Sequence, residues 1–156
     1  VTDIGIQRLS GLNLKSFNAN YCTSISNRSL AVLAAMPSME QIQLDYTKIN
    51  DAGMALLTTA SRLTRLRIRG VDITGAGLAH IAQLKNLSRL NLRDTSLDDA
   101  GLAVIAALPA IDWLDISECR LATPDGLGQL KKASTLTYLD LWETKQMMMC
   151  LRRSVD

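Results

Sequence analysis

The chain has 156 residues, of which 47% are hydrophobic and 21% are charged, and its formal net charge is +2. This composition is typical of one folded globular domain and excludes disordered and collagen-like chains. The small net charge argues against binding of nucleic acid or a membrane surface through overall charge. The longest apolar stretches, residues 30–37 and 101–110, are shorter than the roughly 20 residues that cross a bilayer, so we expect no membrane span.

The cysteines also limit the class of protein. Cys22, Cys119 and Cys150 are an odd number without CxxC spacing. This pattern predicts neither a disulfide framework nor a zinc site. It favours a reducing compartment such as the cytoplasm.

A unit of about 24 residues recurs along the chain. Residues 1–6, VTDIGI, align with residues 49–54, INDAGM, and with residues 73–78, ITGAGL, so the chain starts in the middle of a repeat. Later units begin at Leu14, Met39, Leu63, Leu87, Ile111 and Leu136, at intervals of 25, 24, 24, 24 and 25 residues. We therefore expect about six repeats.

The first half of each unit alternates apolar and polar residues, which predicts a strand with one buried face. The apolar members are Phe17 and Ala19, Ile42 and Leu44, Leu66 and Ile68, Leu90 and Leu92, Leu114 and Ile116, and Leu139 and Leu141. In the second half the apolar residues lie three apart, which predicts one stripe of a short helix. These residues are Leu30, Leu33 and Met36; Met54, Leu57 and Ala60; Leu78, Ile81 and Leu84; and Leu102, Ile105 and Leu108.

A polar residue precedes each helical stripe. Asp3, Asn27, Asp51, Thr74 and Asp99 occupy this place. A side-chain oxygen there can accept a hydrogen bond from a free N–H group of the first helical turn, so we predict that these residues cap the helices. Capping and a tight turn also explain the recurrent Asp-x-Gly without calcium.

The ninth position of every unit holds a small residue, which predicts a buried place beneath the turn from strand to helix. The residues are Cys22, Thr47, Val71, Thr95, Cys119 and Thr144. Cys22 and Cys119 would lie four strands apart, roughly 19 Å at the usual strand spacing, which is too far for a disulfide. We therefore interpret both as structural.

No single unit can bury both of its apolar stripes, so neighbouring units must stack, with parallel strands inside a curve and helices outside. The pattern LxxLxLxx(C/T)x(I/L)xDxGLxxLxxL, over residues 1–146, resembles the leucine-rich-repeat family. In detail it is similar to 24-residue bacterial repeats with an ITDxGL centre and to GALA-type repeats. The resemblance implies an α/β solenoid, or horseshoe, with residues 147–156 forming a cap or a frayed tail.

The third, fifth and seventh positions of each strand segment should point onto the concave face. Five arginines gather on two neighbouring strands of this face, and two tryptophans and a tyrosine on the next two. Arginine and large aromatics dominate the binding energy of protein interfaces. We therefore predict a partner-binding site of Arg65, Arg67, Arg69, Arg89, Asn91, Arg93, Trp113, Asp115, Tyr138, Asp140 and Trp142.

A structural explanation of the arginines stays open, in which they only pair with Asp94, Asp115 and Glu118 across the sheet. It leaves Trp113 and Trp142 unexplained, because an exposed apolar patch usually marks a contact site. We expect a protein partner with an acidic segment and an apolar anchor. The alternative is binding of a polyanion, such as nucleic acid or an inositol phosphate, which the low net charge disfavours.

The sequence shows no recognisable set of catalytic residues. His80 is the only histidine, at a helix position that should face solvent, and HExxH, GxSxG and a Gly-rich phosphate loop are absent. We therefore expect no catalytic residue, metal or cofactor. The family resemblance implies a non-catalytic recognition module, such as the substrate-recognition part of a bacterial effector in a host cytosol or of a ubiquitin-ligase-type protein.

Two hypotheses concern regions beyond this module. An enzymatic domain could belong to a longer parent chain. The apolar run at residues 147–151 could join two copies through uncapped ends.

Overall fold

The computed structural model describes residues 1–144. The predicted cap or tail at residues 147–156, and with it the hypothesis of self-association through residues 147–151, lies outside the described residues.

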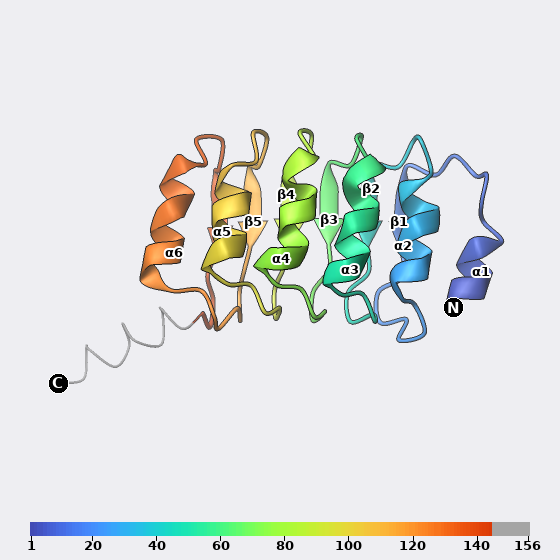
Figure 1. The fold of residues 1–156 in the computed structure, drawn as a ribbon, viewed down its shortest axis with the longest axis horizontal. Helices are drawn as coiled ribbons and strands as arrows, with labels where there is room; N and C mark the ends of the chain where they lie inside the picture. Colours follow the sequence, from blue (N-terminus) through green and yellow to red (C-terminus); the bar gives the residue numbers. More distant parts are fainter. Residues whose placement is uncertain (145–156) are drawn as a thin grey trace.

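Each complete repeat within residues 1–144 contributes one short strand followed by one helix, while α1 precedes the first strand and β6 is the last described element (Figure 1). The strands are β1 (Ser16–Asn18), β2 (Gln41–Gln43), β3 (Arg65–Arg67), β4 (Arg89–Asn91), β5 (Trp113–Asp115) and β6 (Tyr138–Asp140). The α-helices are α1 (Asp3–Gln7), α2 (Asn27–Ala34), α3 (Asp51–Met54), α4 (Gly75–Leu78), α5 (Asp99–Ala106) and α6 (Pro124–Gln129). Three of them continue as 3₁₀ helices, which are η1 (Ala55–Thr59), η2 (Ala79–Gln83) and η3 (Leu130–Lys132).

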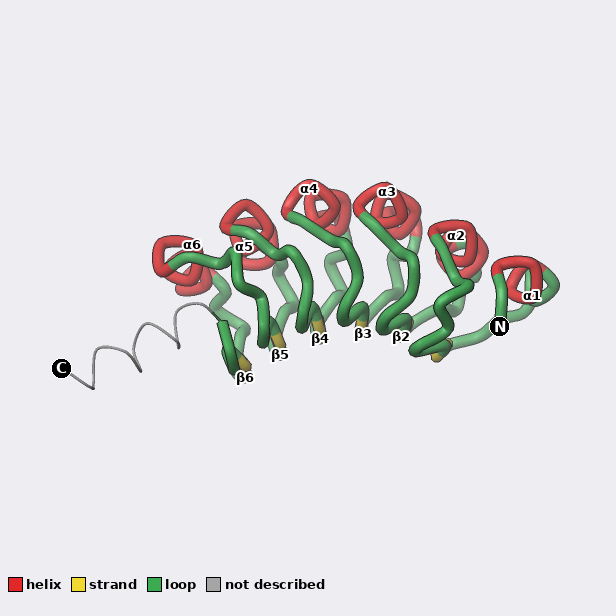
Figure 2. Tube along the Cα trace, turned by 90° about the horizontal axis from the view of Figure 1, so that it is seen from below, coloured by secondary structure: helices red, strands yellow, loops and turns green. Residues whose placement is uncertain are grey.

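The strands form one parallel six-stranded sheet in the order of the chain. Figure 2 shows the strands on the inner side of an arc and the helices on its outer side. Equivalent residues of the repeats are register partners throughout, as in the row Arg65, Arg89 and Trp113. The curved stack predicted from the repeat pattern is confirmed, including the number of repeats.

One continuous apolar core fills the space between the sheet and the helices. The apolar strand pairs of β2 to β5 and all the residues predicted in the helical stripes are buried. The first and last strands are less covered, since Phe17 is only half-buried and Leu139 is exposed. Helices α3 and α4 have a single α-helical turn before their 3₁₀ segments, which agrees with the three-residue spacing of the apolar stripe because a 3₁₀ helix has three residues per turn.

The helix caps lie one residue earlier than predicted, except at Thr74. The capping side chains belong to Thr2, Ser26, Asn50, Thr74, Asp98 and Thr123, each accepting a hydrogen bond from a backbone N–H of the first turn. Asp3, Asn27, Asp51 and Asp99 are instead the first helical residues. Both positions are polar in these repeats, so the sequence pattern alone places the cap only to within one residue.

The acidic first helical residues link each repeat to the next. Asp51 accepts hydrogen bonds from the backbone N–H (2.8 Å) and the hydroxyl (2.6 Å) of Thr74. Asp99 accepts the same pair of bonds from Thr123. The glycine of the following helix leaves room for the carboxylate, because a Cβ on Gly77 would lie 2.9 Å from both the Cα and the carboxylate carbon Cγ of Asp51. The Asp-x-Gly pattern is thus an inter-repeat clamp in addition to a turn.

The ninth position of the repeat is buried beneath the turn in five of the six repeats, as predicted, while Cys22 is half-buried. The hydroxyl of Thr95 donates a 2.7 Å hydrogen bond to the carbonyl of Leu92, and Thr47 and Thr144 repeat this contact with Leu44 and Leu141. The thiol of Cys119 donates to the same Leu92 carbonyl at 3.1 Å. These contacts satisfy carbonyl groups that the short strands leave free.

Candidate binding surface on the concave face

The sheet brings the predicted site residues together on its inner face. The third positions form one row across the strands and the fifth positions form a second, parallel row. Neighbouring strands in a sheet lie about 4.8 Å apart, so side chains from consecutive repeats touch or nearly touch. Residues far apart in the sequence therefore become one continuous surface.

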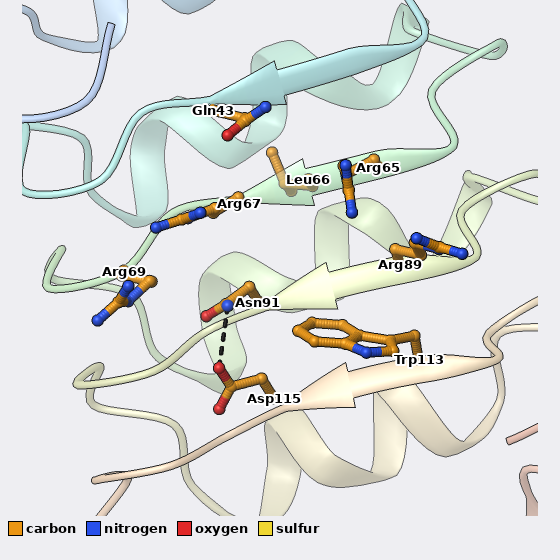
Figure 3. A pocket seen from close by; sticks show the side chains of 9 residues that line it. All are labelled: Gln43, Arg65, Leu66, Arg67, Arg69, Arg89, Asn91, Trp113 and Asp115. Atoms are coloured by element: carbon orange, nitrogen blue, oxygen red, sulfur yellow. Dashed lines mark hydrogen bonds between the residues drawn. The ribbon is translucent and has the colours of Figure 1, made fainter. Parts of the chain in front are cut away.

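A hollow of about 330 Å³ lies in the middle of this face (Figure 3). Arg65 and Arg89 lie at the starts of β3 and β4, and Arg89 lies between Arg65 and Trp113 in the same row. Arg67 lies at the end of β3 and Arg69 just beyond it. The remaining lining residues are Gln43, Leu66, Asn91 and Asp115. The hollow therefore joins the arginine zone to the aromatic zone.

Two of the five arginines are held by acidic residues. Nε of Arg67 lies 2.7 Å from the Asp45 carboxylate, and Nε of Arg93 donates a 3.1 Å hydrogen bond to Glu118, which Nη2 of Arg93 also contacts. The hydrogen bond that Arg93 donates to the Glu118 carboxylate raises the pKa of Arg93 above its ordinary value. Of the three acidic partners that the structural explanation invoked, Glu118 alone forms an ion pair with these arginines among residues 1–144, since Asp94 and Asp115 form none.

The other three arginines, Arg65, Arg69 and Arg89, have no ion pair within the described part of the chain. Nε of Arg69 is buried and has no hydrogen-bond acceptor there. A buried polar group without a partner costs free energy. These side chains provide donors that are available to a ligand in the hollow.

Not every predicted residue on this face is exposed. Asp45 is 0% exposed, Asp115 is 8% exposed and Ser117 is 1% exposed, although the alternation of the strand pattern placed all three on the open surface. The carboxylate of Asp115 accepts hydrogen bonds from the backbone N–H (3.0 Å) and hydroxyl (2.6 Å) of Ser117 and from Nδ2 of Asn91 (2.9 Å). The Asp115 carboxylate is thus hydrogen-bonded within the protein.

These side chains are buried because backbone N–H groups just beyond the strands donate hydrogen bonds to side-chain oxygens of the face. The N–H of each seventh position donates to a side-chain oxygen, either of the fifth-position residue of the same repeat or of the seventh-position residue of the preceding repeat. The acceptors are Asn18 for Asn20, Asn20 for Asp45, Asp45 for Arg69, Asn91 for Arg93, Asp115 for Ser117 and Asp140 for Trp142. The side-chain oxygens of Asn91, Asp115 and Asp140 are therefore hydrogen-bonded within the protein. The side chains available to a partner are the aromatic residues and the three arginines without an ion pair in the described part of the chain.

The aromatic side chains of the face are pre-ordered by one another and by Arg93. The rings of Trp113 and Tyr138 are stacked with centroids 5.0 Å apart and an angle of 2° between their planes. The guanidinium carbon of Arg93 lies 5.1 Å from the ring centroid of Trp142. Tyr138 is 45% exposed and Trp142 is 48% exposed, so both offer apolar area to solvent.

Sequence reasoning missed a feature at the rim of the face. The eighth position of each repeat has a left-handed backbone conformation, at Tyr21, Tyr46, Gly70, Asp94, Glu118 and Glu143. The rings of Tyr21 and Tyr46 stack with centroids 5.1 Å apart, and the Tyr46 ring covers Gly70. Burial and the nearby Asp94 carboxylate raise the pKa of Tyr46. Gly70 was the one signal in the sequence for this conformation, because glycine is the residue that tolerates it best.

Other kinds of site find no support in residues 1–144. His80 is exposed on η2, on the helical side of the arc. The described residues contain no group of three or more histidine, cysteine or acidic side chains placed to hold a metal ion. None of the described helices is long and apolar enough to cross a bilayer.

The repeat, the parallel sheet and the outer layer of helices form the solenoid fold of leucine-rich-repeat proteins. The family model "Leucine Rich repeat" matches residues 83–106, which is one unit of the repeat. This match and the fold together support the leucine-rich-repeat resemblance that the sequence pattern indicates. The 24-residue bacterial subtype stays a prediction.

Two solved structures are similar to this chain in fold. An internalin from Listeria monocytogenes is 22% identical with a TM-score of 0.68, over 93% of this chain and 38% of the internalin chain. The tropomodulin C-terminal domain from Caenorhabditis elegans is 18% identical with a TM-score of 0.62, over 97% of this chain and 96% of that domain. The chain thus spans well under half the length of the internalin. A search of curated proteins finds no match.

Proposed function

We propose that the concave face recognises another protein, without catalysis by this chain. The observation that carries the proposal is the juxtaposition of three arginines with the stacked pair Trp113 and Tyr138. The arginines are Arg65, Arg69 and Arg89, which form no ion pair with any residue of 1–144. An acidic segment of the partner would contact the arginines, and an apolar residue would lie against the aromatic rings. Leucine-rich-repeat folds commonly mediate contacts between proteins.

Interface energetics support this assignment. Arginine and large aromatic residues contribute most of the binding energy in typical interfaces, because they combine large contact area with directed hydrogen bonds. The stacking of Trp113 on Tyr138 and the contact of Arg93 with Trp142 restrict these side chains before a partner arrives. Such restriction reduces the entropy lost on binding. As a wider setting we propose the substrate-recognition part of a bacterial effector or a ubiquitin-ligase-type protein.

The test is affinity capture from a lysate with three forms of the protein. The first is the unchanged chain, and the second carries Arg65→Glu, Arg89→Glu and Tyr138→Ala on the concave face. The matched control carries Arg28→Glu, Lys131→Glu and Leu121→Ala, which are exposed residues outside that face. Capture lost in the concave variant and kept in the control supports the proposal, whereas equal capture by all three forms contradicts it.

Binding of a polyanion is the second candidate, and the same three arginines favour it. It predicts that the logarithm of the binding constant falls steeply and linearly with the logarithm of the salt concentration. A protein partner held partly by apolar contacts predicts a shallower dependence and a clear loss in Tyr138→Ala. Elution of the captured material with increasing salt therefore separates the two candidates.

A further inference from the structure

The hollow on the concave face has an excess of positive charge. Four arginines line it, and the acidic groups near them are Asp115 in its wall and Asp45, which holds Arg67. The guanidinium groups thus exceed the carboxylates by two charges. Both carboxylates already accept hydrogen bonds from the protein itself.

The donors of the hollow are also in excess. A guanidinium has five N–H donors, and the side chains of Arg65, Arg69 and Arg89 form no hydrogen bond or ion pair with the described residues. Arg67, which also lines the hollow, donates from Nε to Asp45, and its two terminal amino groups have no acceptor among residues 1–144. Several guanidinium N–H donors of the hollow are therefore available to a bound anion.

The sheet register places like charges side by side. Arg65 on β3 is the register partner of Arg89 on β4, and Arg67 lies in the same strand as Arg65. Like charges directly opposite one another on neighbouring strands are unfavourable. An anion between them would convert this repulsion into binding energy, since charge-assisted hydrogen bonds to guanidinium are among the strongest in proteins.

We propose, building on the protein-recognition role above, that this hollow binds the phosphate monoester of a phosphorylated side chain on the partner protein. A phosphate monoester carries about −1.5 to −2 charges at neutral pH and has three acceptor oxygens. This charge matches the excess of two, and its oxygens can accept hydrogen bonds from the register partners Arg65 and Arg89, which have no ion pair within residues 1–144. A single carboxylate supplies one charge and two oxygens, so it leaves the hollow cationic.

The aromatic residues fix where an apolar neighbour of the phosphate would lie. Trp113 is on β5 and Tyr138 is on β6, one and two strands beyond Arg89. At the usual strand spacing this is roughly 5–10 Å, or about two to three residues of extended peptide. The favoured sequence is therefore a phosphorylated residue followed or preceded at that distance by an aromatic or large aliphatic residue, on a peptide that crosses the strands.

Matched peptide pools test the proposal. Each pool has serine, glutamate or phosphoserine at the centre of an otherwise random nine-residue peptide with an aromatic residue two or three positions away, and binding is followed by fluorescence anisotropy. We expect the phosphoserine pool to bind at least tenfold more tightly than the glutamate pool. Its affinity should fall several-fold from pH 7.5 to 5.5, because the second phosphate pKa is about 6.

Variants connect the binding to the hollow. Arg65→Gln with Arg89→Gln should abolish the preference for phosphoserine, and Trp113→Ala should weaken selection of the aromatic residue. Arg28→Gln, on the exposed surface of α2, is the matched control and should change neither. Circular dichroism of each variant identifies any loss of binding that comes from unfolding, and Arg89→Lys then serves as the second, milder variant.

The outcomes separate this inference from the proposed function. Equal affinity for the glutamate and phosphoserine pools overturns the phosphate inference and leaves protein recognition standing. Binding of inositol hexakisphosphate that depends on Arg65 and Arg89, without binding of any peptide pool, overturns the inference in favour of a free phosphate ligand. Failure of every pool, together with equal lysate capture by the concave and control variants, overturns both proposals.

Discussion

The carboxylate of Asp51 clamps the backbone N–H and the hydroxyl of Thr74, 23 residues further along the chain. Asp3 with Ser26 and Asp99 with Thr123 make the same connection. A solenoid is held together only by contacts between neighbouring repeats. These clamps therefore supply polar, directional links on the helical side of the arc, where the core itself provides only apolar packing.

Removing the clamp should lower the stability of the whole stack. Asp51→Ala eliminates two hydrogen bonds to a charged acceptor, and we expect a loss of about 2 kcal/mol in the free energy of unfolding. Thr74→Val eliminates the hydroxyl bond and also the N-cap of α4, so it should cost a comparable amount. Urea unfolding measures both. Asp72→Ala is the control, since Asp72 is exposed and should change stability by less than about 0.5 kcal/mol.

A side chain at Gly77 should disturb the same clamp from the other side. A Cβ there would lie 2.9 Å from both the Cα and the Cγ of Asp51, closer than real Cβ contacts come. We expect Gly77→Ala to destabilise by about 1–3 kcal/mol. In Gly128→Ala the new methyl group meets nothing within 4 Å, so helix propensity should make this control stabilising by up to about 1 kcal/mol. Equal effects of the two substitutions would contradict the clamp.

Sequence periodicity predicted the strands, their parallel register and the buried face, because each depends on spacings that every repeat shares. It misplaced the caps by one residue, since Asn50 and Asp51 are both good acceptors and only the neighbouring repeat decides which one caps. It missed the left-handed conformation of Tyr46 because tyrosine rarely adopts it. This conformation comes from the turn that every repeat must make after its strand.

The sequence predicted which residues of the candidate site share one face of the sheet, but it did not predict their hydrogen bonds and ion pairs. Alternation along a strand shows which side a residue lies on, and it correctly placed Arg65, Arg89 and Trp113 together. Alternation cannot show that the carboxylates of Asp45 and Asp115 accept hydrogen bonds from backbone N–H groups just beyond the strands. The sequence pattern also could not show which arginines form ion pairs, because this depends on the direction that each side chain takes toward the neighbouring repeats.

Gly70 provides a test of the left-handed row at the rim. Its φ is +59°, and a Cβ there would lie within 2.8 Å of Cζ of Tyr46. Gly11 also has a positive φ, of +90°, but a Cβ there would meet nothing within 4 Å. We expect Gly70→Ala to cost more than Gly11→Ala, by about 1–3 kcal/mol in thermal or urea unfolding. If both cost the same, backbone strain alone accounts for Gly70 and the Tyr46 ring is not fixed over it.

The clamp at Asp3 should make stability depend on pH in the acidic range. Burial alone would raise the pKa of Asp3, but hydrogen bonds from Ser26 and Ser29 outweigh it and hold the pKa below the ordinary value of 3.8. A carboxylate with a lowered folded-state pKa stabilises the fold above its unfolded-state pKa, and this contribution is lost as the pH falls through the folded-state value.

We therefore expect the first clamp to weaken below about pH 4, the ordinary pKa of an aspartate. The double variant Ser26→Ala with Ser29→Ala should lose stability at pH 6 and show a smaller further loss between pH 4 and pH 2 than the unchanged protein. Urea unfolding across this pH range measures the difference. Parallel pH curves for the two proteins would show that these hydroxyls do not hold the Asp3 carboxylate.

The buried thiol of Cys119 should be chemically inert in the folded protein. Burial raises the pKa of Cys119, and the thiol donates a hydrogen bond to the Leu92 carbonyl beneath the turn. Because the thiolate is the reactive form, we expect iodoacetamide at pH 8 to modify half-buried Cys22 well before Cys119, as followed by mass spectrometry of the separated peptides. In urea the two rates should become similar. Rapid labelling of Cys119 under native conditions would mean that the turn of the fifth repeat opens readily, which would also loosen the adjoining β5 and the Trp113 side of the hollow.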